Sequence, residues 1–154
     1  MSTIDDVLQA KGLALPAAPK PAGAYVPVVR SGDLLFVAGQ LPLKDGELLA
    51  AGPVEVDVSI EQAQQAAAQC LLNGLAIVRG ELDGDLSRVR RIVRIGVFVH
   101  CPAGFAQQPK VADGASELAV ELFGERGRHA RAAVGVNALP RNASVELELV
   151  VEAS

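Results

Sequence analysis

The chain has 154 residues, of which 50% are apolar and 21% are charged, and this composition excludes an intrinsically disordered chain. The net charge of −4 gives no general attraction to phosphate polymers, so nucleic-acid binding is disfavoured from the start. No apolar run is long enough to span a membrane, and the acidic N-terminus lacks the features of a signal peptide, so we expect a cytoplasmic protein. The two cysteines, Cys70 and Cys101, make no disulfide framework and lack the spacing of metal ligands.

The N-terminal residues 1–24 are expected to form a short helix and a proline-rich segment, both packed on a single domain of residues 25–154. Ser2 and Thr3 precede a helical stretch that has acids in its first turn and Gly12 at its end. The stretch "LALPAAPKPAGAYVP" contains four prolines, which exclude regular secondary structure there.

A meander of short strands follows. Residues 24–32 and 33–43 form two β-branched and apolar stretches, and Ser31-Gly32-Asp33 between them is typical of a hairpin turn. Asp45-Gly46, within "LPLKDGELL", predicts a second tight turn of type I′.

Two long helices and one long strand make up the middle of the chain. Residues 59–84 predict a helix whose capping box is formed by Ser59 and Gln62. Residues 105–124 predict a second helix that has Pro109 in its first turn, ends at Gly124 and buries Val111, Ala115, Leu118 and Leu122. Residues 88–101 predict a strand with Val93, Ile95, Val97 and Val99 on one face. We therefore expect an α+β fold in which two long helices cover one face of a mixed β-sheet.

The two closing strands carry charged residues among residues suited to burial. Alternation places Arg131, Ala133, Gly135 and Asn137 on one face of the first strand, and Ala132, Val134 and Val136 on a face that we expect to be core. In the last strand, Val145, Leu147, Leu149 and Val151 form the buried row. Glu146 then points the other way, toward the face on which we expect Arg131.

Two interpretations of this pair are compatible with the pattern. One is a cross-strand ion pair on a solvated sheet face, which contributes under about 1 kcal/mol. The other is a recess in which the guanidinium of Arg131 grips a carboxylate through two hydrogen bonds while Glu146 orients or activates water.

Motifs at both ends of the chain resemble those of one known family. "GDLLFVAGQLPL" is similar to the N-terminal hairpin of the RidA family, also called the YjgF family. "ARAAVGVNALP" followed by "VELE" is similar to its C-terminal signature, including the arginine, the Leu-Pro turn and the glutamate. The chain resembles a divergent subgroup with an N-terminal extension.

The resemblance implies a fold like that of the bacterial trimeric type of chorismate mutase, assembled as a homotrimer with pockets between subunits. It implies hydrolysis of reactive 2-imino acids of the 2-aminoacrylate type to 2-keto acids and ammonia, without a cofactor or metal. This is the activity of a 2-iminobutanoate/2-iminopropanoate deaminase. The matched positions assign Arg131 to the substrate carboxylate, Glu146 to the attacking water, and Tyr25 and Gly39 to the pocket.

Two positions beside the arginine depart from the family pattern. Ala133 stands where RidA itself often has cysteine, and His129 stands where proline or alanine is usual. An extended strand puts both residues on the face of Arg131, so we include them as candidate substrate-binding residues. For His129, a plain residue at the start of the strand is the alternative.

Other residues could carry a different chemistry. His100 and Cys101 are adjacent in a strand and point to opposite faces, which disfavours a catalytic pair. Cys70 lies on the apolar stripe of the first long helix, where a small core residue is expected. The basic stretch Arg88 to Arg94 could contact RNA, but a solvated strand edge or ion pairing at a subunit interface is favoured. A non-catalytic trimer that binds small carboxylates and an endoribonuclease therefore remain the alternative functions.

Overall fold

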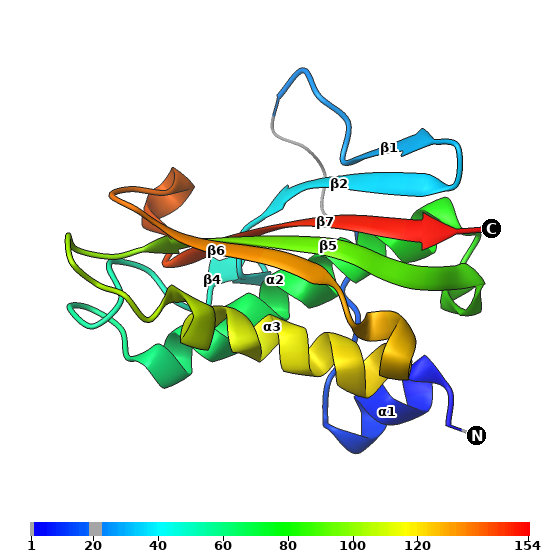
Figure 1. The fold of residues 1–154 in the computed structure, drawn as a ribbon, viewed down its shortest axis with the longest axis horizontal. Helices are drawn as coiled ribbons and strands as arrows, with labels where there is room; N and C mark the ends of the chain where they lie inside the picture. The colour runs from blue at the N-terminus through cyan, green and yellow to red at the C-terminus, as the bar shows by residue number, and fades with distance from the viewer. Residues whose placement is uncertain (1, 19–22) are drawn as a thin grey trace.

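The computed structural model describes residues 2–18 and 23–154, and Figure 1 shows two layers, a sheet and the helices beneath it. The five-stranded sheet has the order β1-β2-β7-β5-β6, in which β5 and β6 run parallel and the other neighbours antiparallel. Its strands are β1 (Val28–Ser31), β2 (Leu34–Gln40), β5 (Val89–His100), β6 (Ala130–Val136) and β7 (Val145–Ala153). The expected mixed sheet is confirmed.

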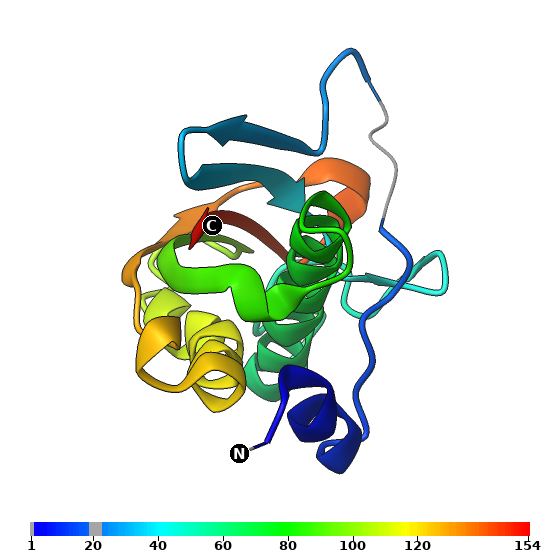
Figure 2. The ribbon, with the colours of Figure 1, turned by 90° about the vertical axis from the view of Figure 1, so that its right-hand side faces the viewer.

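The helices are α1 (Ile4–Ala10), α2 (Ile60–Glu81) and α3 (Gln108–Phe123), with short 3-10 turns at η1 (Leu86–Arg88), η2 (Gly124–Gly127) and η3 (Pro140–Asn142). The long helices α2 and α3 pack against each other under one face of the sheet, as the two views in Figures 1 and 2 show. α1 packs on α3, and Lys11 forms an ion pair with Glu121 of that helix. Residues 19–22 of the proline-rich segment lie outside the described residues. None of the helices in the described parts is long and apolar enough to cross a membrane.

Local sequence signals account for most of the boundaries. Ser59 accepts a hydrogen bond from the backbone of Gln62, whose side chain in turn accepts from the backbone of Ser59, so the predicted capping box is confirmed. The small hairpin of β3 (Leu43–Lys44) and β4 (Glu47–Leu48) turns at Asp45 and Gly46, both of which have the positive φ that a type I′ turn requires.

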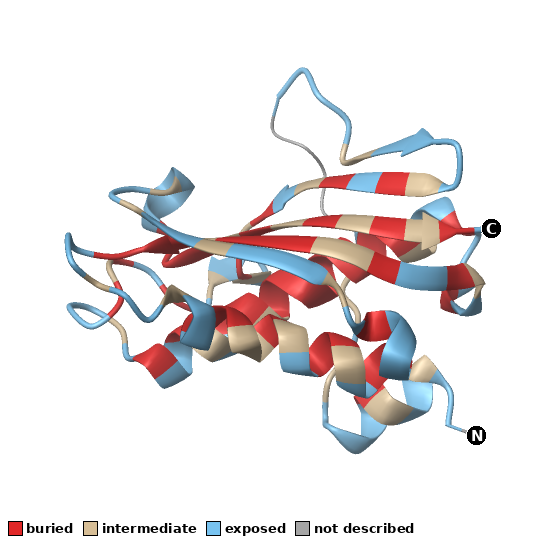
Figure 3. Ribbon diagram, in the orientation of Figure 1, coloured by how far each residue is buried: buried red, intermediate tan, exposed pale blue. Residues whose placement is uncertain are grey.

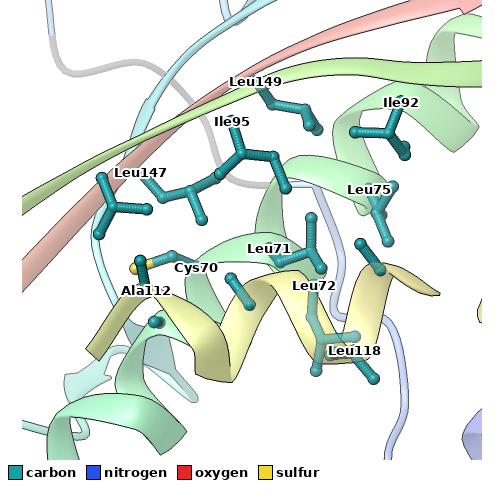
Figure 4. Close-up of a cluster of buried hydrophobic side chains, with 14 of the residues drawn as sticks. Cys70, Leu71, Leu72, Leu75, Ile92, Ile95, Ala112, Leu118, Leu147 and Leu149 are labelled. Atoms are coloured by element: carbon teal, nitrogen blue, oxygen red, sulfur yellow. The ribbon is translucent and has the colours of Figure 1, made fainter. Parts of the chain in front are cut away.

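The core lies between the sheet and the two long helices, and Figure 4 shows part of it. The predicted row of β7 is buried at all four positions, namely Val145, Leu147, Leu149 and Val151. The two helices approach closely at Gly114, where an added Cβ would collide with the backbone carbonyl oxygen of Gln64. Glycine at this position of α3 therefore sets the distance between the helices.

Two predictions about strand faces need correction. The predicted row of β5 is buried at Ile95, Val97 and Val99, and only Val93 departs from it. A bulge between Ile92 and Arg94 shifts the alternation in β5, so Ile92 is buried and Val93 is only partly buried. In β6 the two faces are reversed, because the parallel register sets Arg131 beside the buried Ile95. Val134, expected in the core, is 47% exposed on the other face.

No helix in the described parts of the chain covers the second face of the sheet, which is called the open face below (Figures 1 and 3). Large apolar side chains are exposed on it and on the segment leading into β1, namely Tyr25, Val26, Val29, Phe36 and Val134. Such an apolar surface is typical of a region that packs against another molecule.

Candidate functional site

Arg131 lies on the edge strand β6 and points toward α3. Its Nη1 donates hydrogen bonds to Oδ1 of Asp113 at 2.7 Å and to Oγ of Ser116 at 3.1 Å. The contact with Asp113 is also an ion pair, and the side chain of Arg131 is 25% exposed. The guanidinium is therefore anchored at Nη1, and its Nε and Nη2 donate no hydrogen bond within the described residues.

His129 joins this cluster through Ser116. Its Nε2 lies 2.9 Å from Oγ of Ser116, and its Nδ1 lies 2.6 Å from the carbonyl oxygen of Gly127. A carbonyl only accepts, so Nδ1 carries a proton, and in the neutral ring Nε2 accepts from the serine hydroxyl. Burial lowers the pKa of His129, and the positive charge of Arg131 lowers it further, against the opposing hydrogen bond to Gly127. The prediction that His129 shares the face of Arg131 is confirmed.

A hollow of about 230 Å³ adjoins this cluster and is lined by Ser116, Val120, Arg128, His129 and Arg131. A second hollow of about 310 Å³ lies at the far end of β6, where Gly135, Cys101 and Gln108 contribute to its wall. Ala133 lies on β6 between the two and packs partly against the core. The helix side of β6 thus presents one charged group among small residues.

Glu146 lies on the open face of β7. Its Oε2 is buried and has no hydrogen-bond partner within the described residues. Burial raises the pKa of Glu146, and the nearby negative charge of Glu148 raises it further. An added Cβ on Gly39 would lie 3.0 Å from Oε1 of Glu146, so glycine in β2 leaves room for this carboxylate. The arrangement holds a carboxylate with raised basicity and an unused acceptor atom.

A recess of about 470 Å³ next to Glu148 opens on the same face. Its walls are mostly apolar and come from the segment before β1, from β1, from β2 and from β7, namely Tyr25, Val26, Val29, Phe36, Val37, Ala38, Leu149 and Val150. Tyr25 is 53% exposed at its edge.

The six predicted site residues therefore divide between the two faces of the sheet. Arg131, His129 and Ala133 lie on the helix side, whereas Glu146, Gly39 and Tyr25 lie on or beside the open face. The expectation that Arg131 and Glu146 share a face on neighbouring strands is wrong for a single chain. β5 lies between β6 and β7, and the register aligns Arg131 with Ile95 and Leu149 of the core row.

Sequence reasoning missed Asp113 and Ser116. They are three positions apart on α3, which places both on one side of the helix. β6 follows α3 and returns parallel to β5, so its helix-side residues face α3. The sequence order strand, helix, strand over β5, α3 and β6 was the signal that could have placed Asp113 and Ser116 beside Arg131.

Comparisons with known proteins agree with the motifs. The family model described as "YjgF/chorismate_mutase-like, putative endoribonuclease" matches residues 5–153. The chain belongs to the YjgF family. It is 44% identical to Protein TCP17 of Trypanosoma cruzi over 94% of this chain and 91% of that one. The crystal structure of Atu1372 from Agrobacterium tumefaciens, a protein of unknown function, matches with a TM-score of 0.93 and 45% identity, covering 98% of this chain and 92% of that one.

A relative in the YjgF family with a named activity is more distant. The 2-iminobutanoate/2-iminopropanoate deaminase of Dermatophagoides farinae is 30% identical over 90% of this chain and 93% of that one. The expected YjgF/chorismate-mutase-like fold is confirmed by the family model and by the solved structures.

The two cysteines of this YjgF-family chain are both buried. Cys70 is fully buried against β7, its Sγ lies 4.0 Å from the carbonyl oxygen of Val145, and burial raises its pKa. Cys101 is buried in the wall of the second hollow. Within the described residues, no group of three or more potential ligands could hold a metal ion.

The basic stretch at the start of β5 is mostly paired with acids. Arg88 lies 3.6 Å from Asp83, Arg90 lies 3.2 Å from Asp33, and Arg94 lies 3.1 Å from Glu148. Paired guanidiniums attract a phosphate backbone weakly. This disfavours an RNA-binding strip, and the pairs lie within one chain at partly exposed positions.

Proposed function

We propose that this chain is a cytoplasmic RidA-type deaminase that hydrolyses 2-imino acids to 2-keto acids and ammonia at sites formed between copies of the chain in a homotrimer. The observation that carries the proposal is the division of the site residues. One face offers a guanidinium anchored at Nη1, and the other offers a carboxylate with a buried oxygen. Neither the other guanidinium nitrogens nor this oxygen has a hydrogen-bond partner in the part of the chain that the structure describes. Neither half is sufficient for the reaction, and the sheet separates them within one chain.

The open face supports association of copies. Phe36 is 45% exposed, Val29 is 53% exposed and Val134 is 47% exposed, and their burial would be favourable. Packing the open face of one copy against the β6–α3 edge of the next would bring Glu146 toward the Arg131 of its neighbour. In a closed ring of three copies this contact repeats and forms three equivalent sites.

The chemistry of the two halves fits an imine. The electrophilic C2 of a 2-imino acid adjoins a carboxylate, and a bidentate arginine contact fixes the position of that carbon. Glu146 accepts a proton from water, whose oxygen bonds to C2. The C=N π electrons pass to nitrogen, which takes up this proton from Glu146 to give a carbinolamine. Transfer of the remaining hydroxyl proton to the nitrogen through Glu146 then breaks the C–N bond and forms the C=O bond, which releases ammonia and the 2-keto acid. The raised pKa of Glu146 makes it a stronger base than an ordinary glutamate.

The test is an imine assay in which an amino-acid oxidase generates the substrate and ammonia release is followed. The wild type should accelerate release, and Arg131→Ala and Glu146→Gln should each abolish the acceleration. Reassembly of the two inactive variants as mixed oligomers should restore about one quarter of the wild-type rate, because a quarter of the interfaces then combine an intact arginine with an intact glutamate. No recovery in mixed oligomers would refute a site between copies.

Two other results would favour the alternative functions. Binding of 2-keto acids that depends on Arg131, without any acceleration of imine hydrolysis, would indicate a non-catalytic carboxylate-binding protein. RNA cleavage that survives Arg131→Ala and weakens with rising salt would indicate a ribonuclease.

A further inference from the structure

The contacts of Arg131 with α3 use one nitrogen of the guanidinium. Both hydrogen bonds, to Asp113 and to Ser116, come from Nη1, whose two hydrogens they account for. Nε and Nη2 make no hydrogen bond within residues 2–18 and 23–154. These two nitrogens form the side of the guanidinium that matches a carboxylate with two parallel hydrogen bonds.

Ser116 is itself held in one orientation. Its hydroxyl accepts from Arg131 and donates to Nε2 of His129, while Nδ1 of His129 donates to Gly127. A guanidinium only donates and a carbonyl only accepts, which fixes the two outer hydrogen bonds, and the neutral imidazole of His129 then accepts from Ser116 at Nε2. These hydrogen bonds therefore fix the rotation of the guanidinium plane of Arg131 before any ligand binds.

The negative charge of Asp113 also affects which ligands the hollow can bind. It neutralises Arg131, and the other arginine at the hollow, Arg128, pairs with Glu125 at 3.1 Å. A ligand with one carboxylate can use the free side of Arg131. A second carboxylate on the ligand would find both arginines of this hollow already paired and would be repelled by Asp113.

We propose that Asp113 is a specificity-determining residue that presents the Nε–Nη2 side of Arg131 and restricts the site to monocarboxylates. The inference rests on the proposed function for the role of Arg131, and it concerns a residue that neither the sequence motifs nor the deaminase reaction requires. The favoured substrates are 2-imino acids derived from neutral amino acids, and those with an acidic side chain are rejected.

Binding of two 2-keto acids of equal chain length tests the proposal. 2-Oxopentanoate ends in a methyl group and 2-oxoglutarate in a second carboxylate, and calorimetric titration gives a Kd for each. The wild type should bind 2-oxopentanoate more tightly than 2-oxoglutarate. Asp113→Asn should reduce the ratio of the 2-oxoglutarate Kd to the 2-oxopentanoate Kd about tenfold. Asp113→Glu should retain the preference, because it keeps the charge.

Two further variants separate charge from positioning. Glu117→Gln removes one negative charge from an exposed position on the same helix, and it should leave the ratio of the two Kd values unchanged. Ser116→Ala removes one of the two contacts of Nη1, and it should weaken both ligands by about fivefold without changing the ratio. Thermal melting of each variant confirms that it is folded.

Three results would overturn the proposal. They are a ratio of the two Kd values that is unchanged in Asp113→Asn, a change of this ratio in Glu117→Gln equal to that in Asp113→Asn, and no binding of either keto acid by the wild type. Failure of the deaminase proposal has a different signature. In that case imine hydrolysis is not accelerated, while the two Kd values and their dependence on Asp113 can still be measured.

Discussion

Gly39→Ala is the most direct test of how Glu146 is held. An ideal Cβ at this position lies 3.0 Å from Oε1, 3.1 Å from Cδ and 3.4 Å from Cγ of Glu146. The first two distances are shorter than an ordinary carbon contact, so the carboxyl group must move by a few tenths of an ångström. The φ of Gly39 lies outside the left-handed region, so alanine fits the backbone of β2 without strain.

The consequences for stability and catalysis should therefore differ. Alanine restricts the unfolded chain and stabilises by about 0.5 to 1 kcal/mol, which offsets the small cost of moving a half-buried side chain. The free energy of unfolding should change by less than about 1 kcal/mol. Catalysis depends on where the carboxylate holds water, and kcat/KM should fall about tenfold, equivalent to about 1.4 kcal/mol of transition-state stabilisation.

The imine assay and urea denaturation measure the two effects separately. Gly80→Ala is the matched control, because Gly80 lies on α2 with nothing within 4 Å of an added Cβ, and it should leave kcat/KM unchanged. Full activity of Gly39→Ala, in a preparation where Glu146→Gln is inactive, would show that this contact does not set the position of the catalytic carboxylate.

Four further outcomes are expected. The pH–rate profile of deamination should fall on the acid side through a pKa above the ordinary range of glutamate, because Glu146 must be deprotonated to accept a proton. Glu146→Gln should raise the free energy of unfolding at neutral pH and leave it unchanged at low pH. The folded-state pKa of Glu146 is raised, so the stability that this group contributes is present below its unfolded-state pKa and is lost as the pH rises through its folded-state pKa. Urea denaturation of the wild type and the variant at the two pH values measures this difference. Gly114→Ala should destabilise by about 2 to 3 kcal/mol in urea denaturation, because the carbonyl of Gln64 cannot move aside, whereas Gly80→Ala should not. Phe36→Glu should shift sedimentation velocity from an assembly to a single chain while the far-ultraviolet circular dichroism is retained, and an unchanged assembly would place the interface elsewhere.

Local signals in the sequence determined the elements of this protein and most of its core. The capping box of Ser59, the turn at Asp45 and the alternating burial of β7 depend on residues within a few positions of one another. Such interactions form the same way in many tertiary contexts, so composition and periodicity were enough to predict them. The motifs that contain Arg131 and Glu146 were likewise visible in the sequence, together with the family to which they belong.

The tertiary structure alone decided how the site residues are arranged. Periodicity separates the two faces of a strand but does not say which face is buried, and β6 has small residues on both faces. The insertion of β5 between β6 and β7 depends on pairing across long stretches of sequence. That pairing turned Arg131 toward Asp113 and away from Glu146, because the register of β6 is set by the whole sheet and not by its own residues.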